Sequence, residues 1–318
     1  MSEYKIAIIG AGHIAQEHLR VISATPDMKV SLIFSRTKHK ADTLAKKFGI
    51  TTVAENFSEF LLNLQDIDGI LNLVSAENIF EVTKQLLALR IPLFIEKPPA
   101  LSFKETKELS ELAKKHKTLN MVGFNRRFYS IYQKGIEKIN ENGSLLGVSI
   151  EGHERFWKIK DSLSKEIAEK WLFANSLHTV DLINFFGGNI EKIHSFSSSL
   201  KENHGDQFSL SFKFKSGALG NYSSHWYSPG GWSATLYGEG ITVIFKPLES
   251  GIWIDQNFKE NKISPEKYDI DFKEGFFQQM QCFKSCIENR QLEWPGVSLK
   301  ESLKTLKVIQ TMSLQENE

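Results

Sequence analysis

The sequence has little cysteine, no long apolar run and no excess of charge of either sign. Two cysteines in 318 residues leave no disulfide framework, which favours a reducing compartment. No stretch approaches the roughly 20 apolar residues of a membrane span, and the first residues lack the basic segment of a secretory signal. Lys and Arg number 39 and Asp and Glu 38, so the formal net charge is +1, without the basic excess that nucleic acids and anionic membranes attract. We therefore expect a cytoplasmic protein with no nucleic-acid or membrane partner.

Patterns that bind metals or cradle phosphates in other proteins are also missing. Cys282 and Cys286 share a helical spacing, but no second Cys or His pair completes a zinc site. The nine histidines form no H-E-x-x-H pattern, and neither a G-x-x-x-x-G-K-[ST] loop nor a G-x-S-x-G elbow occurs. The sequence therefore predicts no metal site.

Chain length and hydrophobic pattern predict two domains. A chain of 318 residues exceeds the usual size of one domain. Over residues 1–123, short apolar runs alternate with helical segments, which is typical of a doubly wound parallel sheet with helices on both faces. Residues 124–318 contain longer predicted strands, at 147–155, 190–198, 207–214, 218–225 and 233–238. Several of them alternate in polarity, which predicts a large, open, mainly antiparallel sheet. The expected fold is thus an α/β domain followed by an α+β domain.

A glycine-rich segment follows the first predicted strand and opens the first predicted helix. Gly10-Ala11-Gly12-His13-Ile14-Ala15 fits the dinucleotide-binding fingerprint, with alanine at the third glycine position. The first glycine allows a tight turn, the second lets a pyrophosphate approach the backbone, and the helix N-terminus attracts the phosphates. Residues 1–123 are therefore predicted to form a Rossmann domain, with Gly10, Gly12, His13 and Ile14 as cofactor contacts.

The end of the second predicted strand bears on the choice of cofactor. A carboxylate there would bind a ribose 2′-hydroxyl, but this chain has Ser35 and Arg36. A hydroxyl and a guanidinium suit a 2′-phosphate, so NADP is favoured over NAD. The alternative is that Arg36 stacks on adenine and serves either cofactor.

Three further segments carry a family resemblance. Glu96-Lys97-Pro98 closes a strand, Gly123-Phe124-Asn125-Arg126-Arg127-Phe128 lies at the expected boundary, and His178-Thr179-Val180-Asp181 precedes Gly187-Gly188. With the fingerprint, their order and spacing resemble the Gfo/Idh/MocA family of oxidoreductases along essentially the whole chain. The resemblance implies a Rossmann domain, then a substrate-binding and oligomerisation domain whose sheet forms a homodimer or homotetramer. It also implies oxidation or reduction of a sugar, nucleotide sugar or cyclitol with NADP or NAD.

The resemblance assigns roles to individual residues. Lys97 polarises the reacting oxygen or passes its proton, and His178 is the acid/base beside it. Glu96 pairs with Lys97 or contacts the nicotinamide ribose, and Ser75, Lys97 and Asn125 are further cofactor contacts. The alternatives are a surface lysine after a strand and a structural histidine. Asp181 shares a helix face with His178 and either orients the imidazole or caps another group.

The remaining candidates are substrate contacts. Arg126, His153, Arg155 and Asn175 join His178 in this group, because Arg binds carboxylate or phosphate and polar side chains hold hydroxyls. Aromatic faces stack on sugar C–H surfaces, which adds Trp157, His225, Trp226, Tyr227 and Trp232, although aromatic residues on strands are usually core or interface.

One position departs from the family's pattern. Many members have an aspartate four residues before the histidine, where this chain has Ala174. Asn175 and Ser176 can hold a substrate hydroxyl but cannot replace a carboxylate base. The departure leaves two alternatives open: a glycosidase that uses tightly held NAD for transient oxidation, and a nucleotide-binding regulator without turnover.

Overall fold

The computed structural model describes residues 3–313, which divide by their internal contacts into two compact units. The first unit comprises Met1–Asn125 and Tyr268–Leu303, and the second comprises Arg126–Lys267 and Lys304–Glu318. Residues 268–303 thus group with the N-terminal unit, whereas the sequence prediction assigned 124–318 to one domain; residues 314–318 lie outside the described part.

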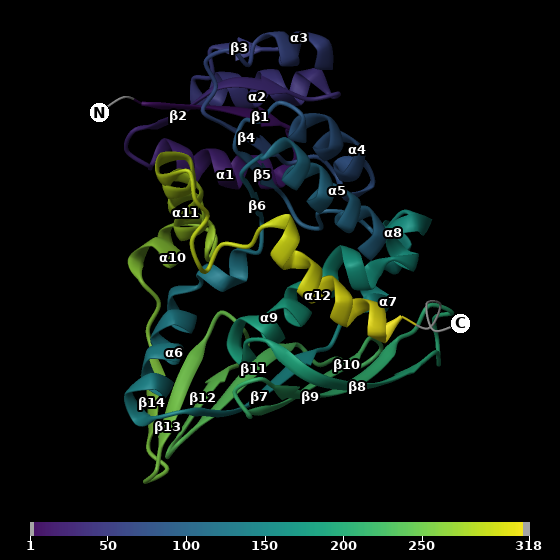
Figure 1. Ribbon diagram of the computed structural model, residues 1–318, viewed down its shortest axis with the longest axis vertical. Helices are drawn as coiled ribbons and strands as arrows, with labels where there is room; N and C mark the ends of the chain where they lie inside the picture. The colour runs from purple at the N-terminus through teal and green to yellow at the C-terminus, as the bar shows by residue number, and fades with distance from the viewer. Residues whose placement is uncertain (1–2, 314–318) are drawn as a thin grey trace. The chain divides into compact units, whose positions relative to one another are not determined.

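The first unit is built on a six-stranded parallel sheet in the order β3-β2-β1-β4-β5-β6 (Figure 1). Its strands are β1 (Tyr4–Ile9), β2 (Met28–Phe34), β3 (Thr52–Val53), β4 (Gly69–Asn72), β5 (Leu93–Ile95) and β6 (Asn120–Val122). Its helices are α1 (His13–Ser23), α2 (Lys38–Phe48), α3 (Phe57–Leu62), α4 (Ala76–Leu87), α5 (Phe103–His116) and α11 (Phe276–Asn289). The predicted Rossmann fold is confirmed: α1 packs with α2 and α11, whereas α4 packs with α5.

Local sequence signals explain where two of these helices begin and end. Ser102 caps α5 by accepting a hydrogen bond from the Glu105 N–H at 3.1 Å, while the Glu105 carboxylate accepts from the Leu101 N–H. Gly49 ends α2 with a φ of +69°, a conformation that glycine adopts without steric cost.

Hydrogen bonds tie residues 268–303 to the first unit. The N–H of Val122, the last residue of the edge strand β6, donates to the Val297 carbonyl at 2.7 Å. From α11, the Gln281 amide donates to Thr25 Oγ1 at 3.0 Å and Lys284 Nζ donates to the Pro26 carbonyl at 3.1 Å. This segment therefore completes the α/β unit from a distant part of the sequence.

The second unit is built on an eight-stranded sheet in the order β14-β13-β12-β11-β7-β10-β9-β8. Its strands are β7 (Leu145–Gly152), β8 (Ile190–Ser198), β9 (Gln207–Phe214), β10 (Leu219–His225), β11 (Trp232–Gly238), β12 (Ile241–Phe245), β13 (Gly251–Asp255) and β14 (Glu260–Ile263). Only the β7–β10 pairing is parallel among those described, so the predicted mainly antiparallel sheet is confirmed. Sequence analysis did not predict β12, β13 and β14, and it extended the first long strand to residue 155, beyond its end at Gly152.

Two helices, α6 (Ser130–Asn142) and α9 (Leu177–Gly187), pack on one face of this sheet. This part of the chain also contains α7 (Phe156–Ile159), α8 (Lys165–Glu169), short 3-10 turns at Asn125–Phe128 and Lys160–Ser162, and a π-helical turn at Leu172–Ser176. α9 packs on β7, β10 and β11, and α6 on β11 to β14 (Figure 1). Two further helices, α10 (Lys267–Asp271) and α12 (Leu299–Met312), cross the boundaries between the units.

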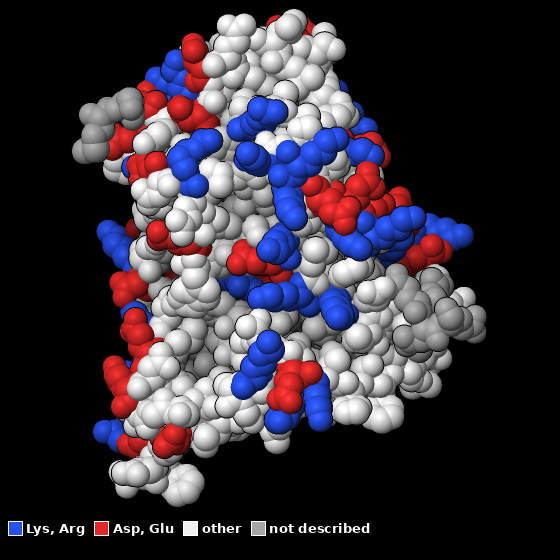
Figure 2. Space-filling view, in the orientation of Figure 1, with Lys and Arg blue, Asp and Glu red and all other residues white. Residues whose placement is uncertain are grey.

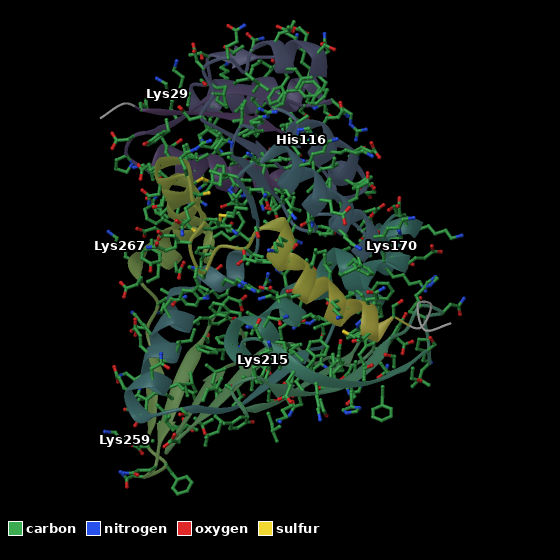
Figure 3. The ribbon with its side chains drawn as sticks, viewed as in Figure 1. Lys29, His116, Lys170, Lys215, Lys259 and Lys267 are labelled. Carbon is green, nitrogen blue, oxygen red and sulfur yellow. The ribbon has the colours of Figure 1, made fainter. Side chains whose placement is uncertain are left out.

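The other face of the eight-stranded sheet carries large exposed side chains. Phe196, Leu219 and Tyr237 are 79%, 62% and 44% exposed. Phe196 and Leu219 pair with the exposed Ser209 and Lys213 of β9, and Leu219 and Tyr237 both pair with Gly147 of β7. The β9–β10 and β13–β14 turns carry the exposed Lys215 and Lys259, both labelled in Figure 3.

On the face drawn in Figure 2, basic and acidic side chains are interspersed. Within residues 3–313, no helix has both the length and the apolarity needed to cross a membrane.

Candidate active site

The fingerprint forms the turn between β1 and α1. Gly10 has a φ of +105°, and a Cβ there would lie 2.6 Å from the Leu73 carbonyl oxygen, so only glycine fits. Gly12 is the N-cap residue of α1, and a Cβ on it would meet no atom within 4 Å. His13 is exposed and Ile14 is half-buried. The first turn of α1 therefore presents its backbone to open space, as binding of a pyrophosphate requires.

The other predicted cofactor contacts in this unit follow neighbouring parallel strands. Ile9 is paired with Phe34 and Asn72, and Asn72 with Ile95, so the carboxyl ends of β1, β2, β4 and β5 share one edge of the sheet. Ser35 and Arg36 follow β2, Ser75 follows β4, and Glu96 and Lys97 follow β5. This is the edge at which doubly wound sheets bind ligands.

Their side chains differ in exposure and in hydrogen bonding. Arg36 is exposed, and the half-buried Ser35 accepts a hydrogen bond from the Thr37 N–H at 3.3 Å. Ser75 is exposed, and its Oγ accepts from Asn78 Nδ2 at 2.8 Å. Asn125 is only 7% exposed, and its Nδ2 donates to the Glu274 carbonyl at 3.1 Å. The Asn125 amide thus helps to hold the segment before α11.

Glu96 and Lys97 occupy different environments. Lys97 is half-buried and joined to Pro98 by a cis peptide bond, whereas Glu96 is 8% exposed. Glu96 Oε2 lies 3.5 Å from Nε2 of His18, a fully buried residue of α1 whose ring contacts Phe94 and Phe276. Sequence analysis missed His18, whose partner lies 78 positions away along the chain.

In the second unit, His178 belongs to a cluster with an arginine and a tryptophan. His178 is 6% exposed at the start of α9, and its ring lies 6.1 Å from that of Trp232. The Arg126 guanidinium lies 4.6 Å from the centre of the Trp232 ring, a cation–π contact. Among the described residues, Nε of Arg126 is buried without a hydrogen-bond partner. The structure thus brings Arg126 and His178 close to the same indole ring.

Asn175 contacts a carboxyl group that sequence analysis missed. Glu154, 4% exposed, lies between β7 and α7 and accepts hydrogen bonds from Asn175 Nδ2 and Ser176 Oγ. Burial raises the pKa of Glu154 to about 7, outweighing the opposing effects of Ser176, Trp171 and Asn175 and of the Arg126 charge. A single glutamate between His153 and Arg155 carries no sequence pattern that would have revealed this.

His153 and Arg155 also lie in the connection after β7 rather than on that strand. The His153 ring stacks on His225 at 5.4 Å, and its Nδ1 accepts from the His225 N–H at 3.2 Å. Burial lowers the pKa of His153. Arg155 and Trp157 are exposed, whereas Trp226, at 3% exposure, packs against Phe156 and Phe208 in the core.

Asp181 holds an arginine rather than standing free on α9. Its oxygens accept from Arg127 Nε at 2.6 Å and Nη2 at 2.8 Å, and Thr305 Oγ1 donates to Oδ1 at 2.8 Å. These contacts agree with the second alternative for Asp181, in which its carboxylate binds another group than the imidazole, here Arg127 and Thr305. Over residues 3–313, no group of three or more His, Cys, Asp or Glu is placed to hold a metal ion.

Comparison with known protein families matches both parts of the chain. Residues 4–124 match the Gfo/Idh/MocA oxidoreductase family model for its NAD-binding Rossmann fold, and residues 148–244 match the Gfo/Idh/MocA C-terminal domain. The chain belongs to the Gfo/Idh/MocA family of oxidoreductases.

Three curated relatives support this assignment. The chain is 33% identical to the uncharacterized oxidoreductase YrbE of Bacillus subtilis over 43% of this chain and 40% of that protein. It is 22% identical to the 4-carboxy-2-hydroxymuconate-6-semialdehyde dehydrogenase of Sphingobium sp. over 98% of both chains. It is 23% identical to the scyllo-inositol 2-dehydrogenase (NAD⁺) of B. subtilis over 90% of this chain and 87% of that one.

Solved structures show the same fold. A dehydrogenase of Chromobacterium violaceum superposes with a TM-score of 0.83 at 18% identity, covering 98% of this chain and 94% of the other. An Agrobacterium radiobacter oxidoreductase in complex with NAD⁺, L-tartaric acid and magnesium gives 0.79 at 14% identity, covering 97% and 94%.

Proposed function

We propose that this protein is a nicotinamide-dependent dehydrogenase or reductase that acts on a hydroxyl or carbonyl carbon of a sugar, nucleotide sugar or cyclitol. The observation that carries the proposal is the shared edge of the parallel sheet, where the open start of α1 and the Glu96-Lys97 segment both lie. Family membership and the relation to an inositol dehydrogenase support it.

The residues at this edge fit a nicotinamide dinucleotide. Gly10 allows the tight turn and Gly12 leaves open space before α1, so Gly10, Gly12, His13 and Ile14 would hold the pyrophosphate. In this proposal Ser35 and Arg36 hold the adenosine ribose, and Ser75, Glu96 and Asn125 complete the cofactor contacts. When bound, the nicotinamide ring donates or accepts a hydride.

The chain's own residues supply binding and proton transfer. In this proposal Lys97 and His178 hold or move the proton at the substrate oxygen, because that proton must leave or arrive when the carbon is oxidised or reduced. Arg126, His153, Arg155 and Asn175 bind the remaining hydroxyl or anionic groups of the substrate. Since Ala174 provides no carboxylate, the ketone-reducing direction, in which these groups only donate protons, suits the chain better.

Arg36 provides a test of cofactor preference. If its guanidinium binds a 2′-phosphate, Arg36→Ala should raise KM for NADPH by about tenfold, the loss of one charge-assisted hydrogen bond, and leave KM for NADH nearly unchanged. Lys38→Ala is the matched control, because Lys38 is also exposed near the end of β2 but pairs with Glu55. Steady-state kinetics with both cofactors decides. A tenfold preference of the unaltered protein for NADH would contradict the assignment.

We also propose a homo-oligomer formed through the open face of the eight-stranded sheet. Leu219 and Tyr237 both pair with Gly147 and expose adjoining apolar surface there, and Phe196 is exposed on the same sheet. Exposed apolar surface of this kind marks interaction sites. Light scattering should give the mass of a dimer or tetramer, and Phe196→Asp combined with Leu219→Asp should lower it. A monomeric mass for the unaltered chain would contradict the proposal.

The two alternatives give different products. A glycosidase of this fold would cleave a sugar with no net change in reduced nicotinamide. A regulator would bind the cofactor and turn over no sugar, nucleotide sugar or polyol.

A further inference from the structure

A buried carboxyl group lies directly against the turn that precedes His178. Ser176 Oγ donates to Glu154 Oε1 at 2.9 Å, and Asn175 Nδ2 lies 3.3 Å from Oε1 and 3.1 Å from Oε2. Asn175 and Ser176 end the π-helical turn Leu172–Ser176, and α9 starts at the next residue. Glu154 comes from the β7–α7 connection and is therefore the tether between that connection and the start of α9.

The turn itself contains no carboxyl group, because its sequence is Leu172-Phe173-Ala174-Asn175-Ser176. Burying a carboxyl costs free energy unless hydrogen bonds compensate, and an apolar side chain would fill the same space at lower cost. π-helical turns within helices often occur at functional sites. A buried glutamate with three hydrogen-bond contacts at this turn is therefore better explained by a role in positioning than by packing.

We propose that Glu154 is a positioning residue of the substrate site. It places a carboxyl group beside the turn before His178, where Ala174 replaces the aspartate of many family members, and it orients the Asn175 amide toward a substrate hydroxyl. This inference rests on the proposed function. An ionised carboxylate only accepts hydrogen bonds, so the Asn175 nitrogen must face Glu154 and the Asn175 oxygen must face away. That oxygen then accepts a hydrogen bond from a substrate that donates one, which selects polyols and sugars with a free hydroxyl beside the reacting carbon.

The environment of Glu154 makes this orientation depend on pH. The groups that face it are Arg126 from the 3-10 turn, Tyr222 from β10, and Trp171, Asn175 and Ser176 from the segment before α9. Because burial raises the pKa of Glu154 to about 7, the carboxyl is protonated below that pH and ionised above it. Once protonated, the group also donates a hydrogen bond and no longer fixes which end of the amide faces it. Substrate binding should therefore strengthen as the pH rises through about 7.

Kinetics of Glu154→Gln and Glu154→Asp test the proposal. At about pH 8, Glu154→Gln should raise KM for substrate by about tenfold, the value of one hydrogen bond, while kcat changes less than threefold. The fall of KM between about pH 6 and 8 should disappear, and KM for the cofactor should not change. Glu154→Asp, which keeps an ionisable group, should retain part of the pH dependence even if its stability is lower.

Asp206→Asn is the matched control. Asp206 is a fully buried carboxylate of the same unit that accepts hydrogen bonds from the N–H groups of Leu200, Lys201 and Glu202, and its pKa is lowered. It stays ionised over this pH range, so its replacement should leave substrate KM and the pH dependence unchanged. Wild-type KM and pH dependence in Glu154→Gln would overturn the proposal.

A measurement without turnover separates this inference from the proposed function. The side-chain amide signal of Asn175, assigned by its loss in Asn175→Ala, should shift in ¹⁵N NMR as the pH passes through about 7, and the shift should vanish in Glu154→Gln. If no substrate is turned over but this coupling is present, the proposed function fails, while the control of the Asn175 amide by Glu154 stands. An Asn175 signal that does not respond to pH overturns the positioning role, whatever the activity.

Discussion

Replacing Lys97 with alanine is expected to lower kcat by about 100- to 10,000-fold, the range by which one positioned acid or base accelerates a reaction. Lys97 is half-buried directly after β5, at the edge of the sheet that carries the fingerprint. Because the glycines of the fingerprint do not depend on Lys97, the dissociation constant for the cofactor should change little. Steady-state turnover and fluorescence titration with reduced nicotinamide measure the two effects separately.

Lys104→Ala is the control for this prediction. Lys104 is exposed in the first turn of α5, so its loss should leave turnover unchanged. Turnover retained in Lys97→Ala would remove Lys97 from the proposed mechanism, and a parallel loss of cofactor binding would assign it to binding instead.

Asp181→Ala should destabilise the second unit by about 3–5 kcal/mol, because it leaves a largely buried guanidinium without its partner. The Arg127 and Asp181 side chains are 12% and 2% exposed and form two hydrogen bonds with each other. Thr305 Oγ1 would lose its acceptor as well. Urea unfolding followed by tryptophan fluorescence gives the free energy of unfolding.

The exposed pair Lys138–Glu141 on α6 is the comparison, with side chains that are 37% and 57% exposed. Since exposed ion pairs contribute about 1 kcal/mol or less, Glu141→Ala should have a small effect. An equally small effect of Asp181→Ala would show that the buried pair is not needed to hold α9 to the 3-10 turn Asn125–Phe128.

The parts of the fold that the sequence predicted are those set by local patterns. Alternation of apolar runs and helices revealed the parallel sheet, and the fingerprint at Gly10 marked the turn after the first strand, because both patterns act within a few residues. The return of residues 268–303 to the first unit depends on contacts such as Gln281 with Thr25, which join positions 256 apart. No local pattern encodes such a contact.

The same distinction applies to the candidate site. The shared edge of the parallel sheet followed from motifs that end strands, so its position could be predicted from spacing, and the cofactor contacts of its residues stay a prediction. Glu154 and His18 could not, because the role of each depends on burial against a segment far along the chain: the turn that ends at Ser176 for Glu154, and Glu96 for His18. A single acidic residue or histidine forms no motif with a characteristic spacing between its residues, so the sequence alone does not single it out.

The most direct test of the account is to follow the absorbance of reduced nicotinamide with the purified protein, NADP⁺ or NADPH, NAD⁺ or NADH, and a panel of polyols, keto-sugars and nucleotide sugars. The account predicts a net, stoichiometric change in reduced nicotinamide with at least one hydroxyl or ketone compound, and its loss in Lys97→Ala. Cofactor binding with no redox change for any compound, or sugar cleavage without net change in reduced nicotinamide, would contradict it.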